Sequence, residues 1–338
     1  MGILHPLNGF DRVVMTQASV PIDAVVIGRN EGARLVACLQ SLAGQVRRLI
    51  YVDSGSTDGS VAVAQAAGAH VVALDLAQPF TAARARNAGL AVLAADPPEF
   101  VQMVDGDCAV QAGWISAAAD FLLTHPNAAL VFGRRRERFP DASIYNLLCD
   151  HEWNTPLGQA HACGGDLLIR WAAVDQVGGY RGDVIAAEDD EMCQRLRGFG
   201  WQLWRIDAEM TLHDAAILRF GQWWRRAVRA GHGFAQVGAL HPVHFVAARR
   251  RVWLWGALLP LVFVAGLWWW PLSLVAVALY VASFLRGVLR FAQQGFGLGQ
   301  ASKASALITL SKFPNLQGVL TYLWRRRQGA AARIIEYK

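Results

Sequence analysis

Two short acidic clusters in the sequence carry side chains that could do chemistry. The first is Asp105-Gly106-Asp107, which directly follows the apolar run at residues 100–104. Two carboxylates on either side of a small residue, at the end of a strand, can hold a divalent cation, and hard oxygen ligands suit Mg²⁺ or Mn²⁺. Such a cation can in turn hold a diphosphate. A solvated turn is the alternative, but the position after a buried strand favours metal binding.

The second cluster consists of four acids at residues 188–191, followed by apolar residues at helical spacing. One explanation is structural, because acids in the first turn of a helix are favoured by the helix dipole. The other is catalytic, because a carboxylate that faces a cleft can take a proton from a substrate hydroxyl. The sequence pattern alone leaves both explanations open.

Strands that alternate with helices are expected to position these acids. Apolar runs at residues 23–28, 49–52, 70–74 and 100–104 predict four strands, and residues 84–93 predict a helix before the fourth. This alternation predicts an α/β fold with a mostly parallel sheet flanked by helices, in which ligands bind beyond the carboxyl ends of the strands. Polar residues follow three of these strands: Arg29, Asn30 and Glu31; Asp53; Asp105 and Asp107.

Two common nucleotide-binding motifs are missing from the sequence. The first strand is followed by Gly28-Arg29-Asn30-Glu31-Gly32, which does not fit the GxGxxG pattern of dinucleotide-binding proteins. No GxxxxGK[ST] phosphate-binding loop is present either. Dehydrogenase and P-loop triphosphatase activities therefore lose their main support.

Seven motifs in a fixed order make the resemblance to one family specific. They lie within residues 21–235 and read IGRNEG, VDSGSTDGS, ARARNAG, VDGD, GGDLLIR, EDDE and LHDA. In this series the chain resembles family 2 glycosyltransferases, which have the GT-A fold. The resemblance implies a nucleotide-diphosphate-sugar donor, a Mn²⁺ or Mg²⁺ cofactor and inversion at the anomeric carbon.

The resemblance also implies roles for the residues that follow the first, second and fourth strands. Asp53 resembles the acid that binds the nucleoside base, and Asp105 resembles the acid near the ribose and the metal. Across Gly106, Asp107 resembles the metal ligand on the diphosphate. Asn30 and Glu31 match the loop that flanks the nucleotide.

Other motifs extend this implied site. Asp189 matches the family's catalytic base, with Asp190 as the neighbouring candidate if the register differs. His213 resembles a further metal ligand, although a structural histidine is an equal alternative. The remaining matches concern the nucleotide, the donor sugar and the diphosphate: Arg84, Arg86, Asn87, Gly164, Gly165, Asp166 and Arg225.

Two basic or aromatic runs allow more than one explanation. Residues 222–226 (QWWRR) resemble the QxxRW motif of processive synthases, but Arg226 stands in place of its tryptophan, so a single sugar transfer is expected. Arg225 and Arg226 could pair with the diphosphate of the donor or of the lipid acceptor, and a solvated basic face is an equal alternative. Of the adjacent Trp223 and Trp224, one is expected to be packed, because neighbouring residues cannot share a helix face. Residues 134–136 (RRR) are most simply a solvated loop, with contact to phosphate as the alternative.

The distribution of charge divides the 338 residues unevenly. Residues 1–240 contain 20 Lys and Arg against 25 Asp and Glu, whereas residues 241–338 contain 12 against one. A basic segment of this kind is typical of contact with nucleic acid or an anionic membrane. The neighbouring apolar residues favour the membrane, so no nucleic-acid partner is expected.

A run of 34 uncharged residues at 252–285 predicts a membrane-associated helical hairpin. One helix of this length would measure about 51 Å, against a hydrocarbon core of about 30 Å. A turn at Trp268-Trp269-Trp270-Pro271 would give two arms, both shorter than a full span. Arginines flank both ends, which places them at the cytoplasmic face by the positive-inside rule. A buried helix pair in a soluble fold is the alternative.

The expected organisation therefore has four parts. They are an N-terminal segment (1–20), a catalytic domain (21–240), the hairpin (241–290) and a basic tail (291–338), in which residues 307–324 form one interfacial helix. Five cysteines without CxxC spacing predict reduced thiols in a cytosolic domain. The expected location is the cytoplasmic face of the inner membrane, close to its lipids.

These expectations predict a hexosyltransferase of family 2 that moves one sugar to a hydroxyl of a lipid-linked acceptor in surface polysaccharide or glycolipid synthesis. Two other functions remain open. A nucleotidyltransferase acting on a sugar phosphate shares the sheet and the metal-binding acid, and a membrane-bound scaffold could bind nucleotide without catalysis. Release of a nucleoside diphosphate would distinguish transfer of a sugar from both.

Overall fold

The structure is a computed structural model that describes residues 20–329 and 334–336. Its four N-terminal strands confirm the predicted ones: β1 (Ile22–Gly28), β2 (Arg48–Asp53), β3 (His70–Ala73) and β4 (Phe100–Asp105). They pair in parallel, in the order β3-β2-β1-β4. The helices between them are α1 (Ala33–Leu42), α2 (Ser60–Ala66) and α3 (Ala82–Leu93). Valine and isoleucine on both faces of β1 are buried, as expected for a strand covered on both sides.

The second half of the sheet is mixed. It continues through β8 (Leu167–Arg170), β6 (Ala128–Glu137), β9 (Gln202–His213) and β5 (Cys108–Val110), while β7 (Gly158–Ala160) pairs with β9. Of these pairings only β6 with β9 is parallel; β4–β8, β6–β8, β5–β9 and β7–β9 are antiparallel. β9 has 12 residues and ends at His213. The sheet is therefore parallel where the sequence alternates strand and helix, and mixed beyond.

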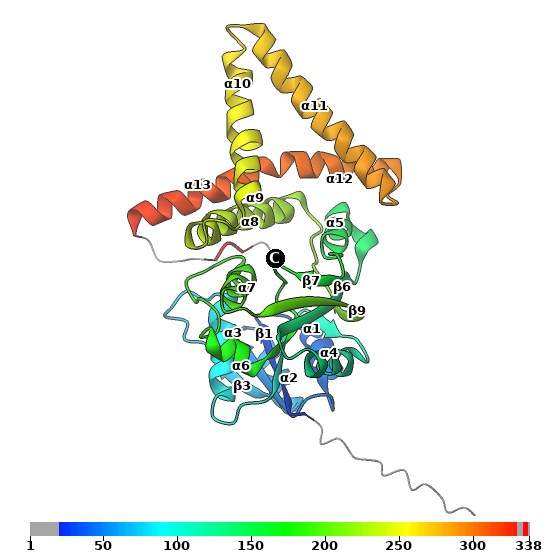
Figure 1. The fold of residues 1–338 in the computed structure, drawn as a ribbon, viewed down its shortest axis with the longest axis vertical. Coiled ribbons are helices and arrows are strands. Elements are labelled where there is room, and N and C mark those ends of the chain that lie inside the picture. The colour runs from blue at the N-terminus through cyan, green and yellow to red at the C-terminus, as the bar shows by residue number, and fades with distance from the viewer. Residues whose placement is uncertain (1–19, 330–333, 337–338) are drawn as a thin grey trace, which may run out of the picture.

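Helices between the later strands complete this part of the molecule (Figure 1). They are α4 (Trp114–Thr124), η1 (Pro140–Ala142), α5 (Ile144–Glu152), α6 (Trp171–Gln176) and α7 (Glu188–Gly198). The C-terminal part is helical: α8 (Phe220–Leu240), α9 (Val246–Arg251), the π-helical segment η2 (Val252–Leu258), α10 (Leu259–Ala265), α11 (Trp270–Gln293), α12 (Leu298–Leu310) and α13 (Lys312–Gln328). Figure 1 shows that these helices lie beyond one end of the sheet, with α10 and α11 projecting away from it.

The predicted hairpin is present, and its turn lies where the sequence indicated. The first arm ends at Ala265, and the second begins at Trp270, with Pro271 in its first turn, where the missing N–H is tolerated. The second arm is longer than predicted, because α11 continues through Arg286 and Arg290. It is the one helix in the described part of the chain that is long and apolar enough to cross a membrane, with a mean hydropathy of 2.0.

The hairpin is not the buried helix pair that a soluble fold would contain. Only 6% of the apolar window of α11 is buried. At the turn, Trp268 is 84% exposed. The opposite face of the arm base is close-packed: Gly256 in η2 lies so near α13 that an added Cβ would be 2.6 Å from Lys312 O. Pro260 follows Gly256 by four residues, and its ring excludes the regular helical bond there, which accounts for the π-helical segment.

The prediction of one helix at residues 307–324 is wrong, because two helices cover these residues. Two helices, α12 and α13, meet at Ser311. Pro314 has no N–H to bond Leu310 O, and its ring clashes with that carbonyl, so one straight helix cannot continue. Pro314 and Asn315 are buried, whereas Trp324 is exposed at 61%. The break therefore turns α13 across the molecule, where one of its faces packs.

The catalytic part and the C-terminal helices meet where α8 and α13 cross. A Cβ on Gly318 would overlap Val228 O of α8 and lie 2.6 Å from His232 N. A Cβ on Gly231 would likewise overlap Asn315 O. Side chains at either position would force the two backbones apart. The crossing therefore depends on two glycines, one from each helix.

Gly318→Ala should lower the free energy of unfolding by about 1–3 kcal/mol, because the new methyl overpacks the crossing. Gly299→Ala is the matched control in α12, since a Cβ there meets nothing within 4 Å. It should leave stability unchanged or raise it slightly through helix propensity. Thermal unfolding of both variants is the measurement. Equal melting temperatures would show that the crossing has room for a side chain.

Candidate active site

The candidate site lies at the carboxyl ends of β1, β2 and β4. Gly28 at the end of β1 pairs with Asp53 of β2, and Ile27 pairs with Asp105 of β4. This register brings the predicted acids to one edge of the sheet. Three further elements reach this edge: α3, the loop before β8, and the start of α7.

Asp53 holds the loop that follows its own strand. Its Oδ2 accepts hydrogen bonds from Gly55 N at 3.0 Å and Ser56 N at 2.9 Å, and its Oδ1 accepts one from Tyr51 OH at 3.1 Å. Asn30 N donates to Ser56 Oγ, which ties the loops after β1 and β2 together. The Asp53 carboxylate thus shapes the predicted nucleotide-facing loop. Its contact with a nucleoside base stays a prediction.

Asn30 and Glu31, in the loop after β1, are also held in place. Asn30 adopts a left-handed backbone conformation with φ of 57° and accepts a hydrogen bond from Thr57 N at 2.7 Å. Glu31 forms an ion pair with Arg34 at 2.8 Å. An added Cβ on Gly106 would lie 3.1 Å from Ile27 O, so the triplet runs close to the first strand. The first-strand loop is therefore packed against the acidic triplet.

Arg86 on α3 connects three of the acids. Its side chain is 3% exposed. It donates to Asp105 Oδ1 at 2.8 Å and to Glu188 Oε1 at 2.8 Å, and its Nη1 lies 3.3 Å from Asp189 Oδ1. A buried guanidinium is stable only when it is paired in this way. Arg86 therefore fixes the distance between the strand β4 acid and the acids of α7, rather than projecting into solvent.

Close packing explains why the second glycine of the GGDLLIR motif, Gly165, has no side chain. A Cβ on Gly165 would overlap Arg86 Nη2 and lie 3.3 Å from Asp105 Oδ1. Any side chain here would displace the guanidinium. The following Asp166 is buried and accepts hydrogen bonds from Asp105 N at 3.1 Å and Thr211 Oγ1 at 2.7 Å. It braces the site; its predicted contact with a sugar hydroxyl is untested.

Arg135 is a residue that sequence reasoning placed wrongly. The run at 134–136 is not a solvated loop but part of the end of β6, where Arg134 is buried, Arg135 is half-buried and Arg136 is exposed. Its Nη2 lies 3.3 Å from Asp105 Oδ2 and its Nε lies 3.3 Å from Asp166 Oδ2. The ring of Trp153 covers the guanidinium at 4.9 Å. No local pattern marks Arg135 in the sequence, because the irregular register between Phe132 and Arg135 interrupts the alternation of the strand.

Two arginines therefore hold Asp105 ionised. Burial by itself raises the pKa of this carboxyl, but Arg86 and Arg135 outweigh burial and lower the pKa below its ordinary value. The same arginines occupy both carboxylate oxygens. The predicted contribution of Asp105 to a metal thus competes with two ion pairs.

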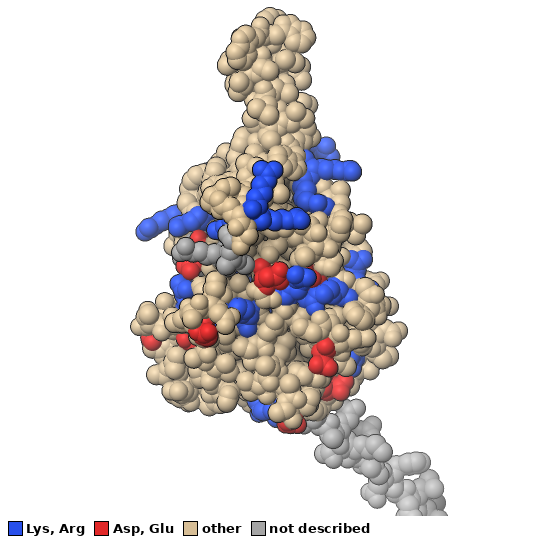
Figure 2. Space-filling view, turned by 90° about the vertical axis from the view of Figure 1, so that its left-hand side faces the viewer, with Lys and Arg blue, Asp and Glu red and all other residues tan. Residues whose placement is uncertain are grey.

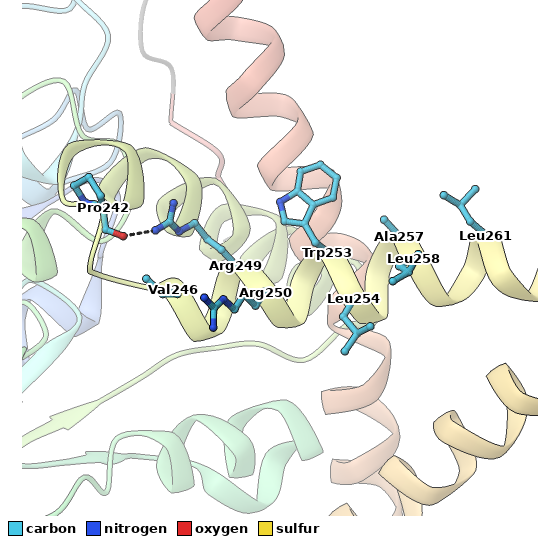
Figure 3. A pocket seen from close by; sticks show the side chains of 9 residues that line it. All are labelled: Pro242, Val246, Arg249, Arg250, Trp253, Leu254, Ala257, Leu258 and Leu261. Atoms are coloured by element: carbon cyan, nitrogen blue, oxygen red, sulfur yellow. Dashed lines mark hydrogen bonds between the residues drawn. The ribbon is translucent and has the colours of Figure 1, made fainter.

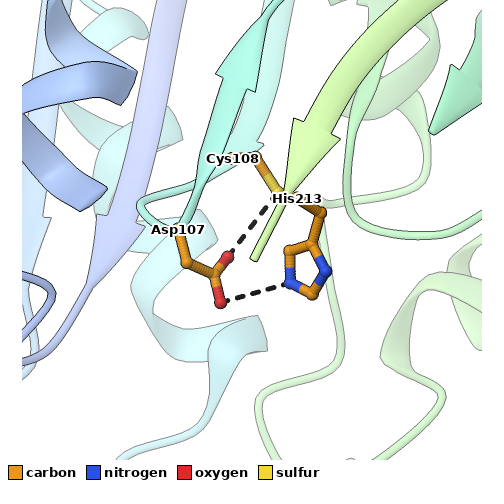
Figure 4. A group of neighbouring side chains, drawn as sticks. All are labelled: Asp107, Cys108 and His213. Carbon is orange, nitrogen blue, oxygen red and sulfur yellow. Dashed lines mark hydrogen bonds and ion pairs between the residues drawn. The ribbon is translucent and has the colours of Figure 1, made fainter. Parts of the chain in front are cut away.

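Asp107 and His213 form the better-placed metal site. Strand pairing sets His213 opposite Cys108, next to the triplet, and Asp107 Oδ2 lies 3.2 Å from His213 Nε2 (Figure 4). Both side chains are only 7% exposed. Cys108 Sγ lies 3.6 Å from Asp107 Oδ1, and one ligand atom from each of the three residues lies within 4.8 Å of the others. An oxygen and a nitrogen ligand at this spacing fit Mn²⁺.

Glu137 is a supporting residue that the sequence did not single out. Its Oε2 lies 3.9 Å from His213 Nδ1 and accepts a hydrogen bond from Ala215 N at 3.0 Å. Trp153 packs edge-on against the imidazole at 4.7 Å. Acidic partners of a ligating histidine fix the orientation of its ring. The metal-binding face of His213 is thereby directed toward Asp107.

Asp189 is the better candidate for a catalytic base than Asp190. Both lie in the first turn of α7, and the N-cap residue Ala187 before it has a φ of 60°. Asp189 faces Arg86, while Asp190 Oδ1 lies 3.2 Å from His244 Nε2. Burial raises the pKa of Asp189 well above its usual range; Arg86 opposes this, and Glu188, Asp105 and Asp190 reinforce it. A buried carboxyl with a raised pKa is suited to accept a proton.

Three residues expected at the nucleotide make other contacts. Arg84 donates to Gln78 O at 3.0 Å and Pro79 O at 2.7 Å, so it supports the loop before α3. Asn87 donates to Tyr180 O and accepts from Tyr180 N, which fixes the segment before α7. Arg225 donates to Gly221 O within its own helix. The structure does not bring these three to the acids, and contacts with a donor stay predictions.

The two tryptophans of α8 are packed as expected for neighbours on a helix. Trp223 is buried with Cys149, Ala215 and Ile217, while Trp224 donates to Gln317 of α13 at 2.9 Å. Arg226 donates to Glu152 at 2.9 Å. These contacts join α8 to α5 and α13. The five cysteines are unpaired, as predicted.

Comparison with known proteins agrees with this geometry. The sequence model of the family described as Glycosyl transferase family 2 matches residues 23–161. A pre-mycofactocin glycosyltransferase of Mycobacterium tuberculosis is 29% identical over 240 residues, 65% of this chain and 48% of that protein. A TPR repeat-containing protein of Synechococcus elongatus is 34% identical over 90 residues, 27% of this chain and 21% of that protein. The chain spans at most about half the length of these relatives.

A solved structure extends the likeness over nearly the whole chain. A mannosyltransferase of Pyrobaculum calidifontis in complex with GDP-Man and Mn²⁺ has a TM-score of 0.59 at 18% identity. The alignment covers 91% of this chain and 88% of that one. At this identity the likeness concerns the fold, including the C-terminal helices. Residues 23–161 therefore match the sequence model of glycosyltransferase family 2, and the fold of the chain is GT-A.

Proposed function

We propose that the chain transfers one sugar, with inversion, from a nucleotide-diphosphate sugar to a hydroxyl of a lipid-linked acceptor. The observation that carries the proposal is Arg86, which holds the acid of β4 and the candidate base of α7 around one edge of the sheet. Inverting transfer requires the base and the metal-held diphosphate to lie on opposite sides of one carbon, and Arg86 sets the distance between Asp189 and the end of β4, where Asp107 follows. The mannosyltransferase with GDP-Man and Mn²⁺ supports a donor of this class.

In the proposed reaction, Asp189 accepts the proton of the acceptor hydroxyl as the oxygen attacks C1 of the donor sugar. The bond from C1 to the diphosphate oxygen breaks on the opposite face, so one displacement inverts C1. A divalent cation held by Asp107 and His213 would neutralise the charge that develops on the leaving diphosphate. Asp107 and Asp189 are largely buried, which strengthens these electrostatic effects.

The membrane and lipid part of the proposal rests on the surface of the C-terminal helices. Apolar side chains cover the exposed hairpin, including Leu261 at 66% and Trp270 at 71% exposure. Figure 2 shows that Lys and Arg gather just below the hairpin, while the hairpin itself carries no charge on that face. A basic belt under an apolar projection suits a bilayer with anionic headgroups. The positive-inside rule favours the cytoplasmic leaflet.

The direct test is product analysis with purified full-length protein, a panel of nucleotide-diphosphate sugars and a lipid extract. Asp189→Asn should lower transfer about 10²- to 10⁴-fold, since the amide cannot accept the proton. Nucleotide affinity should stay within about twofold. Asp190→Asn is the matched control and should retain activity. Full turnover by Asp189→Asn, or release of diphosphate instead of nucleoside diphosphate, would refute the proposed chemistry.

Removing a metal ligand should separate metal-dependent from metal-independent nucleotide binding. Asp107→Ala and His213→Ala should each lower the affinity for nucleoside diphosphate in Mn²⁺ about tenfold or more, because a hydrogen-bonded or coordinated charge is lost. Affinity in a chelator should not change. Titration by calorimetry with and without Mn²⁺ measures the difference. Variants whose affinity still rises with Mn²⁺ as in the unsubstituted protein would place the metal elsewhere.

The pH dependence should report the raised pKa of Asp189. The base must be ionised to act, so kcat/KM should fall as the pH drops through a pKa above the usual carboxyl range. Glu188→Gln removes a negative neighbour and releases Arg86, and both effects lower the pKa of Asp189. The acid limb of the pH profile should therefore move to lower pH. A shift to higher pH would contradict the assignment of the base.

A further inference from the structure

The outer face of the first hairpin arm has a groove that the proposed chemistry does not use. Its volume is about 740 Å³. Arg249 and Arg250 line one end, and Trp253, Leu254, Leu258 and Leu261 continue along the arm away from the catalytic part (Figure 3). Positions 250, 254 and 258 are four residues apart, so they share one face of the helical arm. The groove thus passes from charged to apolar along its length.

The charged end of the groove is prepared for an anion. Arg249 Nη2 donates to Pro242 O at 2.6 Å and to His244 O at 3.3 Å, and a Cβ on Gly238 would lie 2.7 Å from Arg249 Nε. This guanidinium is therefore fixed on α8 and the loop after it. Arg250 is exposed and forms no ion pair with the part of the chain that the structure describes. The pair places one fixed and one available cation side by side.

The apolar end of the groove remains open to whatever surrounds the hairpin. Trp253 is 44% exposed, Leu258 53% and Leu261 66%. A free phosphate would use only the arginines and would leave this wall uncovered. A purely apolar ligand would leave Arg250 without a partner. An amphiphile with an anionic head and a hydrocarbon chain matches both ends of the groove. Its chain would lie along the helical arm.

The groove is connected to the candidate base. The loop between α8 and α9 carries His241 and His244, whose Nε2 atoms lie 3.1 Å from Glu191 Oε1 and 3.2 Å from Asp190 Oδ1. The same loop supplies the carbonyls that hold Arg249. Both acids belong to the first turn of α7, next to Asp189. A head group at the arginines would therefore lie at the side of the molecule that presents the base.

We propose that this groove binds the lipid phosphate of the acceptor, with the start of its hydrocarbon chain along Trp253, Leu254 and Leu258. The inference rests on the proposed function and names the surface that selects its acceptor. It assigns the phosphate to Arg249 and Arg250 instead of Arg225 and Arg226 of α8, because Arg226 already pairs with Glu152. Its consequence is selection of lipid-linked hydroxyls over soluble ones.

The test compares Arg250→Glu with Arg326→Glu, a matched change at an exposed arginine at the end of α13. The probe is a polyprenyl phosphate in neutral phosphatidylcholine vesicles, and full-length protein is assayed by co-flotation. Vesicles with phosphatidylglycerol at the same molar charge distinguish a specific lipid phosphate from general anionic lipid. Leu258→Asp, in the apolar wall, is the second variant. KM values for lipid acceptor and for donor are measured separately.

Arg250→Glu should weaken polyprenyl phosphate binding about tenfold or more and raise KM for the lipid acceptor alone. Leu258→Asp should do the same, whereas Arg326→Glu should change binding less than twofold. Equal losses for the two arginine variants, or equal binding to phosphatidylglycerol, would overturn the groove as an acceptor site. Binding that depends on Arg250 while Asp189→Asn turns over normally would instead refute the proposed base and leave the groove in place.

Discussion

One buried guanidinium organises the candidate site. Arg86 lies between the acid of β4 and two acids of α7, three carboxylates that would otherwise repel one another. Removing one partner from such a buried arrangement is expected to cost about 3–5 kcal/mol, because the remaining charges are then uncompensated. The same residue explains why the neighbouring loop contains Gly165, because any side chain at this position would occupy the space of the guanidinium. Arg86 thus constrains the site in two ways at once, through its ion pairs with the acids and through its close packing against Gly165.

This constraint divides the carboxylates into two groups with different tasks. Asp105 and Asp166 are held by arginines and backbone or hydroxyl donors, so they shape the site. Asp107 faces His213 at the end of β9, where an oxygen and a nitrogen ligand are available to a cation. Asp189 is buried, with a raised pKa, at the start of α7. The proposed transfer uses Asp107 and Asp189 directly and depends on Asp105 and Asp166 for its geometry.

The C-terminal helices relate the site to a lipid surface through few, close contacts. Gly231 and Gly318 let α8 and α13 cross with touching backbones, and Gly256 lets the first hairpin arm approach α13. His241 and His244 then join the loop after α8 to the first turn of α7. These contacts form a continuous path from hairpin to candidate base. On the proposed function, the path sets the position of a lipid head group relative to the donor.

The sequence by itself determined the elements whose patterns are local: the four parallel strands, the acidic triplet at the end of β4, and the apolar hairpin with its turn before Pro271. The ordered motifs were enough for the family. Tertiary structure alone decided that Asp107 and His213 lie together, because the pairing of β5 with β9 joins segments more than a hundred residues apart. It also moved Arg135 from an expected loop into the site. Burial and ion pairing between distant segments leave no periodic pattern in the sequence, so only the folded chain shows them.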